Sequence, residues 1–362
     1  MSGAGAHVVV GLSGGVDSAV SAYLLKQQGY RVSGLFMVNW TDDEQGYCTA
    51  ADDFQDARAV CEELQIPLHR VDFSAEYRER VFQHFLADYA AGKTPNPDLL
   101  CNREVKFQPF REHALRLGAD YVATGHYAQL QQAPDGPRLL RSVTEDKDQT
   151  YFLALVARAQ FERVLFPIGG LTKPQVREIA VKAGLPNHRK RDSTGICFIG
   201  EREFRGFLQQ YLKPDPGDIV DDNGRTIGRH QGLMYYTLGQ RRGLNIGGVR
   251  GAREAPWFVV AKDSARKQLH VSQDPQHPLL MRMALRTVPF SWIRRPPVTP
   301  PRLLARIRHR QTLQGCTATI NDDGRVDVVF EQAQRAVSPG QYCVLYDGEE
   351  CLGGGEIEAA LR

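Results

Sequence analysis

The chain has 362 residues, of which 42% are hydrophobic and 24% charged, and its 45 basic residues nearly balance 42 acidic ones, for a net charge of +3. This apolar content excludes general disorder, the length predicts two or three domains, and so small a charge does not by itself indicate nucleic-acid binding. We expect no membrane span and no secretory signal, because no long apolar run is present. Seven cysteines without a CxxC pair predict a reduced, cytoplasmic protein rather than a disulfide framework or a structural zinc finger.

The first part of the chain alternates between short apolar runs and stretches with helical spacing. Residues 7–12 are nearly all apolar, as is typical of a buried parallel strand. Val16, Val20 and Leu24 then recur at helical spacing until Gly29. This alternation predicts an α/β domain with a doubly wound parallel sheet. Further strands are predicted at 31–38, 68–73 and 120–124, and further helices at 52–65, 75–91, 106–117 and 173–183.

The second part of the chain reads as β-structure. The dipeptides Asn223-Gly224, Asp323-Gly324 and Asp347-Gly348 are typical of hairpin turns, and the prolines at 296–297 and 300–301 predict a stiff connector. We therefore expect an α/β catalytic domain at residues 1–205, a small mixed or β-rich domain at 206–280 and a C-terminal β-barrel at 281–362.

The strongest local motif is Gly-Leu-Ser-Gly-Gly-Val-Asp-Ser at residues 11–18, between a predicted strand and a predicted helix. Paired glycines let the backbone approach an anion, and a helix N-terminus supplies N–H donors. The spacing is neither that of a Walker A motif nor that of a dinucleotide fingerprint. It resembles the SGGxDS loop of PP-loop ATP pyrophosphatases. That resemblance implies that the loop binds ATP, which is split between its α and β phosphates, and that Asp17 helps to hold Mg²⁺.

Two cysteines stand in sequence contexts of their own. Cys101 follows Asn96-Pro97-Asp98, where the prolines at 95 and 97 predict a rigid, non-helical loop. Cys197 follows the basic residues 189–191, which would favour a thiolate. From local sequence alone, reactivity and simple packing explain both cysteines equally well. The other five cysteines are expected to be buried packing residues.

Several motifs, in order along nearly the whole chain, resemble those of one family, the bacterial tRNA-specific 2-thiouridylases. This family sulfurates the wobble uridine of certain tRNAs. Leu12 in the phosphate loop is a conservative departure from its pattern. Besides the loop, the motifs that carry the resemblance are residues 96–107, 123–127, 147–149, 193–200 and 230–244.

The resemblance implies a role for individual residues. Cys197 would carry a persulfide, Cys101 would be its partner nucleophile, and Asp98 is a candidate general acid or base, with a turn residue as the alternative reading. Met37 and Gly125 would line the adenosine pocket, at the carboxyl ends of strands where α/β sheets bind ligands. ATP would be held by Gly11, Leu12, Ser13, Gly14, Gly15, Val16, Asp17 and Ser18, the target base by Asn96, Pro97 and Asp98, and tRNA by Lys147, Asp148, Gln149, Arg308 and His309.

The implied reaction is the ATP-dependent 2-thiolation of a tRNA uridine. Adenylation of the C2 oxygen makes it leave as AMP. The Cys197 persulfide, loaded by a sulfur-relay donor protein, supplies the sulfur, either by attacking C2 directly or after release as hydrosulfide. Cys101 ends bonded to Cys197, and this disulfide must then be reduced. The base must leave its stack to react.

The stretch from Arg294 to Arg310 contains six arginines and His309 but no acidic residue. Arginine pairs with phosphates and stacks on bases, so this stretch is a candidate RNA surface. The alternative is a solvated basic face.

Two other functions, and one variant of the mechanism, compete with the thiolation reading. An amide-forming PP-loop ligase would want a glutaminase segment, and no such segment precedes the loop. A non-catalytic tRNA-binding protein would leave both cysteines idle. In a variant of the thiolation mechanism, which we do not favour, Asp98, Cys101 and Cys197 hold an iron–sulfur cluster.

Overall fold

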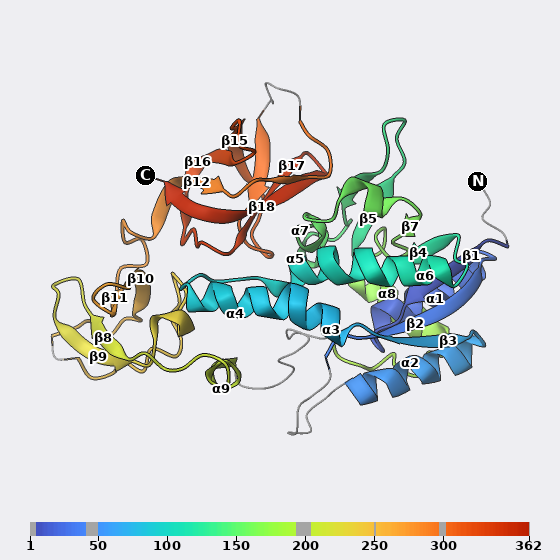
Figure 1. The fold of residues 1–362 in the computed structure, drawn as a ribbon, viewed down its shortest axis with the longest axis horizontal. Helices are drawn as coiled ribbons and strands as arrows, with labels where there is room; N and C mark the ends of the chain where they lie inside the picture. Colours follow the sequence, from blue (N-terminus) through green and yellow to red (C-terminus); the bar gives the residue numbers. More distant parts are fainter. Residues whose placement is uncertain (1–4, 41–49, 193–203, 250, 297–301, 362) are drawn as a thin grey trace.

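The structure is a computed structural model that describes residues 5–40, 50–192, 204–249, 251–296 and 302–361. These residues form an α/β part, a small middle part and a C-terminal barrel, with the two β-rich parts lying at one side of the α/β part (Figure 1). Among the described residues, no helix is both long and apolar enough to cross a bilayer. The predicted classes of architecture are thus confirmed, in the predicted order.

A five-stranded parallel sheet, in the order β3-β2-β1-β4-β7, forms the centre of the α/β part. Val8 and Val10 of β1 pack in one hydrophobic cluster and Val9 in another, so both faces of the sheet are covered. Strand β7 was not predicted, because two residues carry no periodicity. The strands are β1 (His7–Gly11), β2 (Arg31–Val38), β3 (Leu68–Asp72), β4 (Tyr121–Ala123) and β7 (Val164–Leu165), and helices beside them are α1 (Val16–Gln27), α2 (Ala50–Leu64) and α8 (Lys173–Lys182).

Two long helical stretches connect β3 to β4, and the second corrects a prediction. The segment around Cys101 is helical, not a rigid loop. Pro97 takes the first helical position, where its missing N–H costs nothing, and the Asn96 side chain caps the helix by accepting from the Asp98 amide at 3.2 Å. A π-helical turn farther on accommodates Pro109. The stretches are α3 (Ser74–Tyr77), η1 (Arg78–Phe82) and α4 (Gln83–Ala90), then α5 (Pro97–Cys101), η2 (Asn102–Phe110) and α6 (Arg111–Arg116).

The middle part is a four-stranded sheet in the order β10-β11-β8-β9. Its predicted hairpin turn is confirmed: Gly224 has a φ of 75°, a conformation that glycine adopts without strain, and links β8 to β9. A helix, α9 (Phe204–Gln209), precedes the sheet. The strands are β8 (Gly217–Val220), β9 (Thr226–His230), β10 (Phe258–Asp263) and β11 (Gln268–Ser272).

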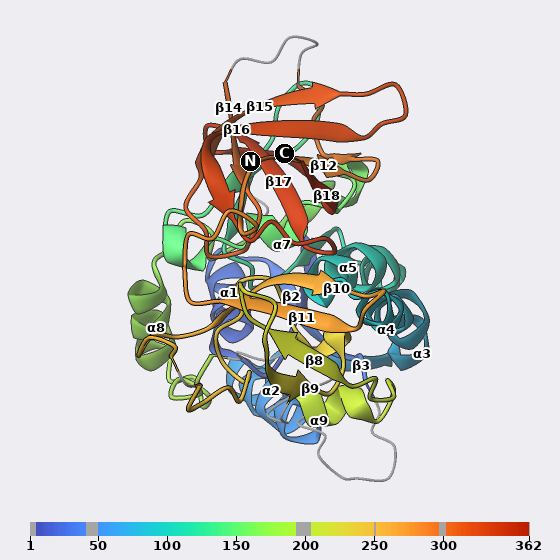
Figure 2. The ribbon, with the colours of Figure 1, turned by 90° about the vertical axis from the view of Figure 1, so that its left-hand side faces the viewer.

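The C-terminal sheet closes into a barrel because β12 pairs with both β16 and β18. The two other predicted turns, at Gly324 and Gly348, are confirmed with φ of 82° and 58°. Figure 2 shows this barrel stacked above the α/β part. Its strands are β12 (Met281–Thr287), β14 (Leu303–Arg306), β15 (Gln314–Ile320), β16 (Val326–Arg335), β17 (Tyr342–Asp347) and β18 (Glu350–Leu361), and β13 (Ser291–Trp292) pairs with β18.

A hairpin of the α/β part joins the barrel sheet. Strands β5 (Ala128–Gln131) and β6 (Arg138–Arg141) pair with each other, and β6 pairs with β18. Segments on the two sides of the expected boundary at residue 205 therefore share one sheet. Long-range strand pairing of this kind leaves no local sequence signal.

A buried ion pair lies beside this shared sheet. Arg306 of β14 donates to Asp148 at 2.8 Å, and their side chains are only 1% and 0% exposed. The other Asp148 oxygen accepts from the amides of Ser142 and Thr150. The carboxylate therefore holds the barrel on the α/β part with most of its acceptor capacity used.

This pair can be tested by unfolding. Arg306→Met should lower the free energy of unfolding by about 3 kcal/mol, because the buried Asp148 would keep, among the described residues, only Arg141, at 3.8 Å, as a counter-charge. The double change with Asp148→Ala should cost less. Arg302→Met, which removes an exposed pair with Glu331, is the matched control and should change the thermal midpoint far less. Equal losses for Arg302→Met and Arg306→Met would contradict the assignment.

Candidate active site

The loop at residues 11–15 connects β1 to α1 at the carboxyl edge of the sheet. Gly15 precedes the helix, and no side chain caps α1, so the first amides of the helix remain open to an anion. Inside the loop, the Ser18 hydroxyl donates to the Gly15 carbonyl at 3.0 Å and accepts from the Ser13 amide at 3.2 Å. The Ser13 side chain is exposed. The loop thus has the open, donor-rich form that a polyphosphate requires.

Two glycines let other segments approach this loop closely. Gly14 has a φ of 74°, and a Cβ there would collide with the backbone of Asp53. A Cβ on Gly125, just after β4, would lie 2.7 Å from the Ser18 amide nitrogen and 2.8 Å from the Asp17 carbonyl carbon. Of the predicted ATP-site glycines, Gly14 therefore lets α2 approach the loop, and Gly125 lets the segment after β4 approach the start of α1. Met37 lies half-buried near the end of β2, the neighbouring strand.

Asp17 and Asp192 share a lysine. Lys173, the first residue of α8, donates to Asp17 at 2.8 Å and to Asp192 at 2.7 Å. The Tyr127 hydroxyl also donates to Asp17, at 2.9 Å. Both oxygens of Asp17 therefore accept hydrogen bonds from Lys173, and one of them also accepts from Tyr127.

Asp192 gathers further positive charge beside the nucleotide loop. Arg177 and Lys147 donate to it at 2.7 and 2.9 Å. Burial raises the pKa of Asp192, but the hydrogen bonds from Lys173 and Lys147 outweigh this effect and lower the pKa to about 2. Asp192 is therefore ionised at any working pH, and it holds three cations close to the place expected for pyrophosphate.

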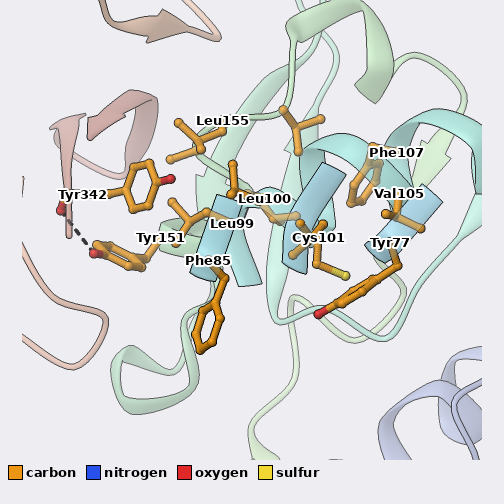
Figure 3. Close-up of a cluster of buried hydrophobic side chains, with 14 of the residues drawn as sticks. Tyr77, Phe85, Leu99, Leu100, Cys101, Val105, Phe107, Tyr151, Leu155 and Tyr342 are labelled. Atoms are coloured by element: carbon orange, nitrogen blue, oxygen red, sulfur yellow. Dashed lines mark hydrogen bonds between the residues drawn. The ribbon is translucent and has the colours of Figure 1, made fainter. Parts of the chain in front are cut away.

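The helix α5 places Asp98 and Cys101 three residues apart, on one face. Cys101 is 2% exposed and belongs to a hydrophobic cluster that includes Val105 and Phe107, as Figure 3 shows. Burial raises the pKa of Asp98, although Lys106 opposes this effect. A carboxyl group with a raised pKa, one turn from a thiol, is suited to proton transfer.

The same helical stretch reaches the nucleotide loop at its other end. A Cβ on Gly11 would lie 3.0 Å from the ring of Phe110, the last residue of η2. Phe107 packs against His126, whose Nδ1 is 2.7 Å from the Thr124 hydroxyl. Burial lowers the pKa of His126 to about 3, so its ring is neutral. The cysteine helix and the nucleotide loop are thus parts of one packed unit.

The residues expected to contact tRNA lie in different environments. Lys147 pairs with Asp192, and Gln149 accepts from the Tyr127 amide at 2.9 Å. A direct contact between Asp148 and tRNA does not fit its burial against Arg306. In the barrel, Arg308 donates to the Ala336 carbonyl at 2.7 Å, and the His309 ring lies 4.2 Å from that of Phe152.

The arginine-rich stretch is less free than its sequence predicted. Arg294 forms a two-bond ion pair with Glu350, Arg302 pairs with Glu331, and Arg306 is buried. Acidic residues distant in the sequence thus neutralise half of the six arginines. The run of positive charge in the sequence therefore does not form an equally strong positive patch in the folded protein.

Cys197 lies outside the described residues, as does the rest of segment 193–203. In the basic cluster before it, Lys190 pairs with Asp53 and Asp56 of α2. No group of three metal-ligand side chains occurs in the part of the chain that the structure describes.

The three structural parts correspond to three known domain families. The tRNA methyl transferase HUP domain matches residues 6–201, the tRNA methyl transferase PRC-barrel domain 205–273, and the aminomethyltransferase beta-barrel domain 282–357. The tRNA-specific 2-thiouridylase MnmA of Alcanivorax borkumensis is 55% identical over 354 residues, 97% of both chains. The chain belongs to the tRNA-specific 2-thiouridylase family. A second relative, the tRNA-specific 2-thiouridylase MnmA of Sodalis glossinidius, is 56% identical over 355 residues, which are 97% of this chain and 96% of the relative.

Family membership confirms the resemblance seen in the motifs, but sequence reasoning missed several residues of the site. Lys173 was taken only as the start of a helix, and Tyr127 only as part of a motif. Asn187, which donates to the Gly14 carbonyl at 2.9 Å, gave no signal at all. One feature of the sequence could have indicated Lys173, which lies at the predicted N-terminus of a helix. The helix dipole is positive at that end, so a lysine is unfavourable there unless an acidic residue pairs with it.

The close approach at Gly125 yields a test. Gly125→Ala should abolish ATP-dependent AMP formation, because the added methyl group would displace the amide of Ser18 from the loop. Gly170→Ala is the matched control, since a Cβ there meets nothing within 4 Å, and it should retain wild-type activity. Normal AMP formation by Gly125→Ala would contradict the placement of the nucleotide.

The raised pKa of Asp98 has a consequence for stability. The neutral form of Asp98 is favoured in the folded protein. Its contribution to the free energy of unfolding is therefore fully present below the ordinary pKa of an aspartic acid, and it is lost as the pH rises through the higher pKa of the folded state. Asp98→Asn should therefore raise the thermal midpoint at pH 7.5 more than at pH 4, while thiolation falls. A larger gain at pH 4 would mean that the carboxylate, not the acid, is stabilised.

Proposed function

We propose that this chain is an ATP-dependent tRNA-uridine 2-sulfurtransferase acting on the wobble uridine. The observation that carries the proposal is that one helical stretch, residues 97–116, bears Asp98 and Cys101 at one end and packs on the phosphate loop at the other. A nucleophilic site and an adenylation site side by side are what replacement of a carbonyl oxygen by sulfur requires. The relatives' name, tRNA-specific 2-thiouridylase, supports the same reading.

In this reaction, ATP and tRNA are substrates. The open amides of α1 and the loop bind the β and γ phosphates, and Lys173 stabilises the charge that develops on pyrophosphate. Asp17 would help to hold a Mg²⁺ ion that accompanies ATP and neutralises phosphate charge. The uridine C2 oxygen attacks the α phosphorus, and pyrophosphate leaves. Asn96 and Pro97 shape the start of α5, so we place the target base there, next to Asp98.

Sulfur then replaces the activated oxygen. The terminal sulfur of a Cys197 persulfide, loaded by a donor protein, attacks C2, and AMP leaves with the oxygen. The Cys101 thiolate attacks the Cys197 sulfur and breaks the bond to the transferred sulfur, which stays on the base. The product is 2-thiouridine and a Cys101–Cys197 disulfide, which a cellular thiol must reduce before the next turnover. We place the reaction in the cytoplasm, in keeping with the free thiols of the described cysteines.

The cysteines provide the test of this proposal. Cys197→Ser should take up no labelled sulfur from a persulfide donor, whereas Cys101→Ser should take it up and fail later. Both variants should still bind ATP and tRNA but form no 2-thiouridine in nucleoside mass analysis, because serine cannot form the S–S bond. Cys61→Ala, a buried cysteine of α2, is the control and should thiolate normally.

Multiple turnover by Cys101→Ser would return Cys101 to a packing role. Formation of an amide product, or ATP binding without any AMP, would favour the ligase or the non-catalytic alternative. An absorbing cluster after anaerobic purification would favour the iron–sulfur variant.

A further inference from the structure

The middle part contains a cavity that the proposed chemistry does not use. It has a volume of about 500 Å³, which is in the range of small-molecule and cofactor sites. One wall is formed by residues between 241 and 249, which include the end of the motif at 230–244, and the other by residues 252–257. Arg241, Arg253 and Trp257 are among its lining residues, together with one acid, Glu254.

The arginines at this cavity are free to bind an anionic ligand. Arg241 and Arg253 line it, Arg242 lies next to Arg241 in the chain, and all three are exposed. In the described ranges their guanidinium groups form no ion pair and no hydrogen bond. This contrasts with Arg294, Arg302 and Arg306 of the barrel, which acidic side chains already neutralise. Among the described residues, the middle part therefore holds exposed arginines without acidic partners, as the barrel stretch still does at Arg295 and Arg310.

Side chains of the same domain hold both walls in place. On the first wall, Gln240 accepts from the Thr237 amide and donates to the Arg242 carbonyl, each at 2.9 Å, and Arg205 of α9 donates to the Gly243 carbonyl at 3.1 Å. On the second wall, Gln273 accepts from the Arg253 amide at 3.0 Å and donates to the carbonyls of Arg253 and Ala255, both at 2.7 Å. These hydrogen bonds fix the backbone of both walls, so the shape of the cavity is set by the fold.

The floor of the cavity is apolar. Leu244 is 5% exposed, and it belongs with Cys101 to the same hydrophobic cluster. Ile246 and Trp257 pack against that cluster while still lining the cavity. A half-buried indole beside unpaired arginines suits an unstacked nucleotide, whose base stacks on the ring while its phosphates meet the guanidinium groups.

We propose that this cavity binds a nucleotide of the tRNA substrate other than the target uridine. The proposal rests on the proposed function, since it takes tRNA as the substrate. The middle sheet lies at the opposite side of the molecule from β1 and α2 (Figure 1), and neither Asp98 nor Cys101 lines the cavity, so we assign it a nucleotide other than the one that reacts near α5. Arg241 and Arg253 contact its phosphates, and Trp257 stacks on its base.

The first test measures the affinity for full-length tRNA at fixed salt. The double variant Arg241→Ala/Arg253→Ala should bind about tenfold more weakly, and the slope of log K against log salt should fall by about two, because two phosphate contacts are lost. Thiolation should show a raised KM for tRNA and an unchanged kcat. Arg266→Ala is the matched control: its side chain is 76% exposed in the same domain, and it should bind as the wild type does.

The second test separates stacking from structural support. Trp257→Ala should weaken tRNA binding at least about fivefold, and Trp257→Phe should restore most of the affinity because phenylalanine also stacks. Wild-type affinity in the double variant, or an equal loss in Arg266→Ala, would overturn the proposal.

These readouts are separate from those of the proposed function. A wild-type protein that binds tRNA but makes no 2-thiouridine would refute the thiolation reaction and leave the binding test intact. A protein that thiolates normally while both cavity variants bind like the wild type would refute the cavity alone.

Discussion

The buried contact between Asp148 and Arg306 is the constraint on which the active site depends. It fixes the segment that follows β6, and the next residue, Gln149, accepts from the amide of Tyr127 and donates its own amide to the Tyr127 carbonyl at 2.9 Å. Tyr127 in turn donates to Asp17 in the nucleotide loop. A short path of hydrogen bonds thus runs from the barrel to the phosphate site. The position of the barrel and the geometry of the loop are set together.

A second junction lies just before the cysteine helix. The carbonyl of Gly92 accepts from Lys262 of the middle part at 2.9 Å, and the Thr94 hydroxyl donates to that of Thr237. The Thr94 amide donates to the Pro339 carbonyl, and its carbonyl accepts from Gln341 of the barrel. Burial lowers the pKa of Lys262 to about 8, so this junction sits in a dry environment. The start of α5 is therefore held by all three parts of the molecule.

The distribution of arginines explains how a protein with a net charge near zero can still bind RNA. Pairing with Glu350, Glu331 and Asp148 turns barrel arginines into structural groups, because a guanidinium that already has two short bonds to a carboxylate gains little from phosphate. Arginines without such partners remain for the ligand. Their location depends on which acidic residues the fold brings near, and so it cannot be read from a run of charges.

Local patterns in the sequence determined the parallel sheet, the hairpin turns at Gly224, Gly324 and Gly348, the phosphate loop and the family, because each depends on residues that are close in the chain. The helix at Cys101 was misread, since the rule that prolines break helices ignored the first helical position. Only the tertiary structure decided that β6 joins β18, that Lys173 bridges Asp17 and Asp192, and that Asp148 is buried. These contacts join residues 19 to more than 200 positions apart, and their energies come from burial and pairing that no local window contains.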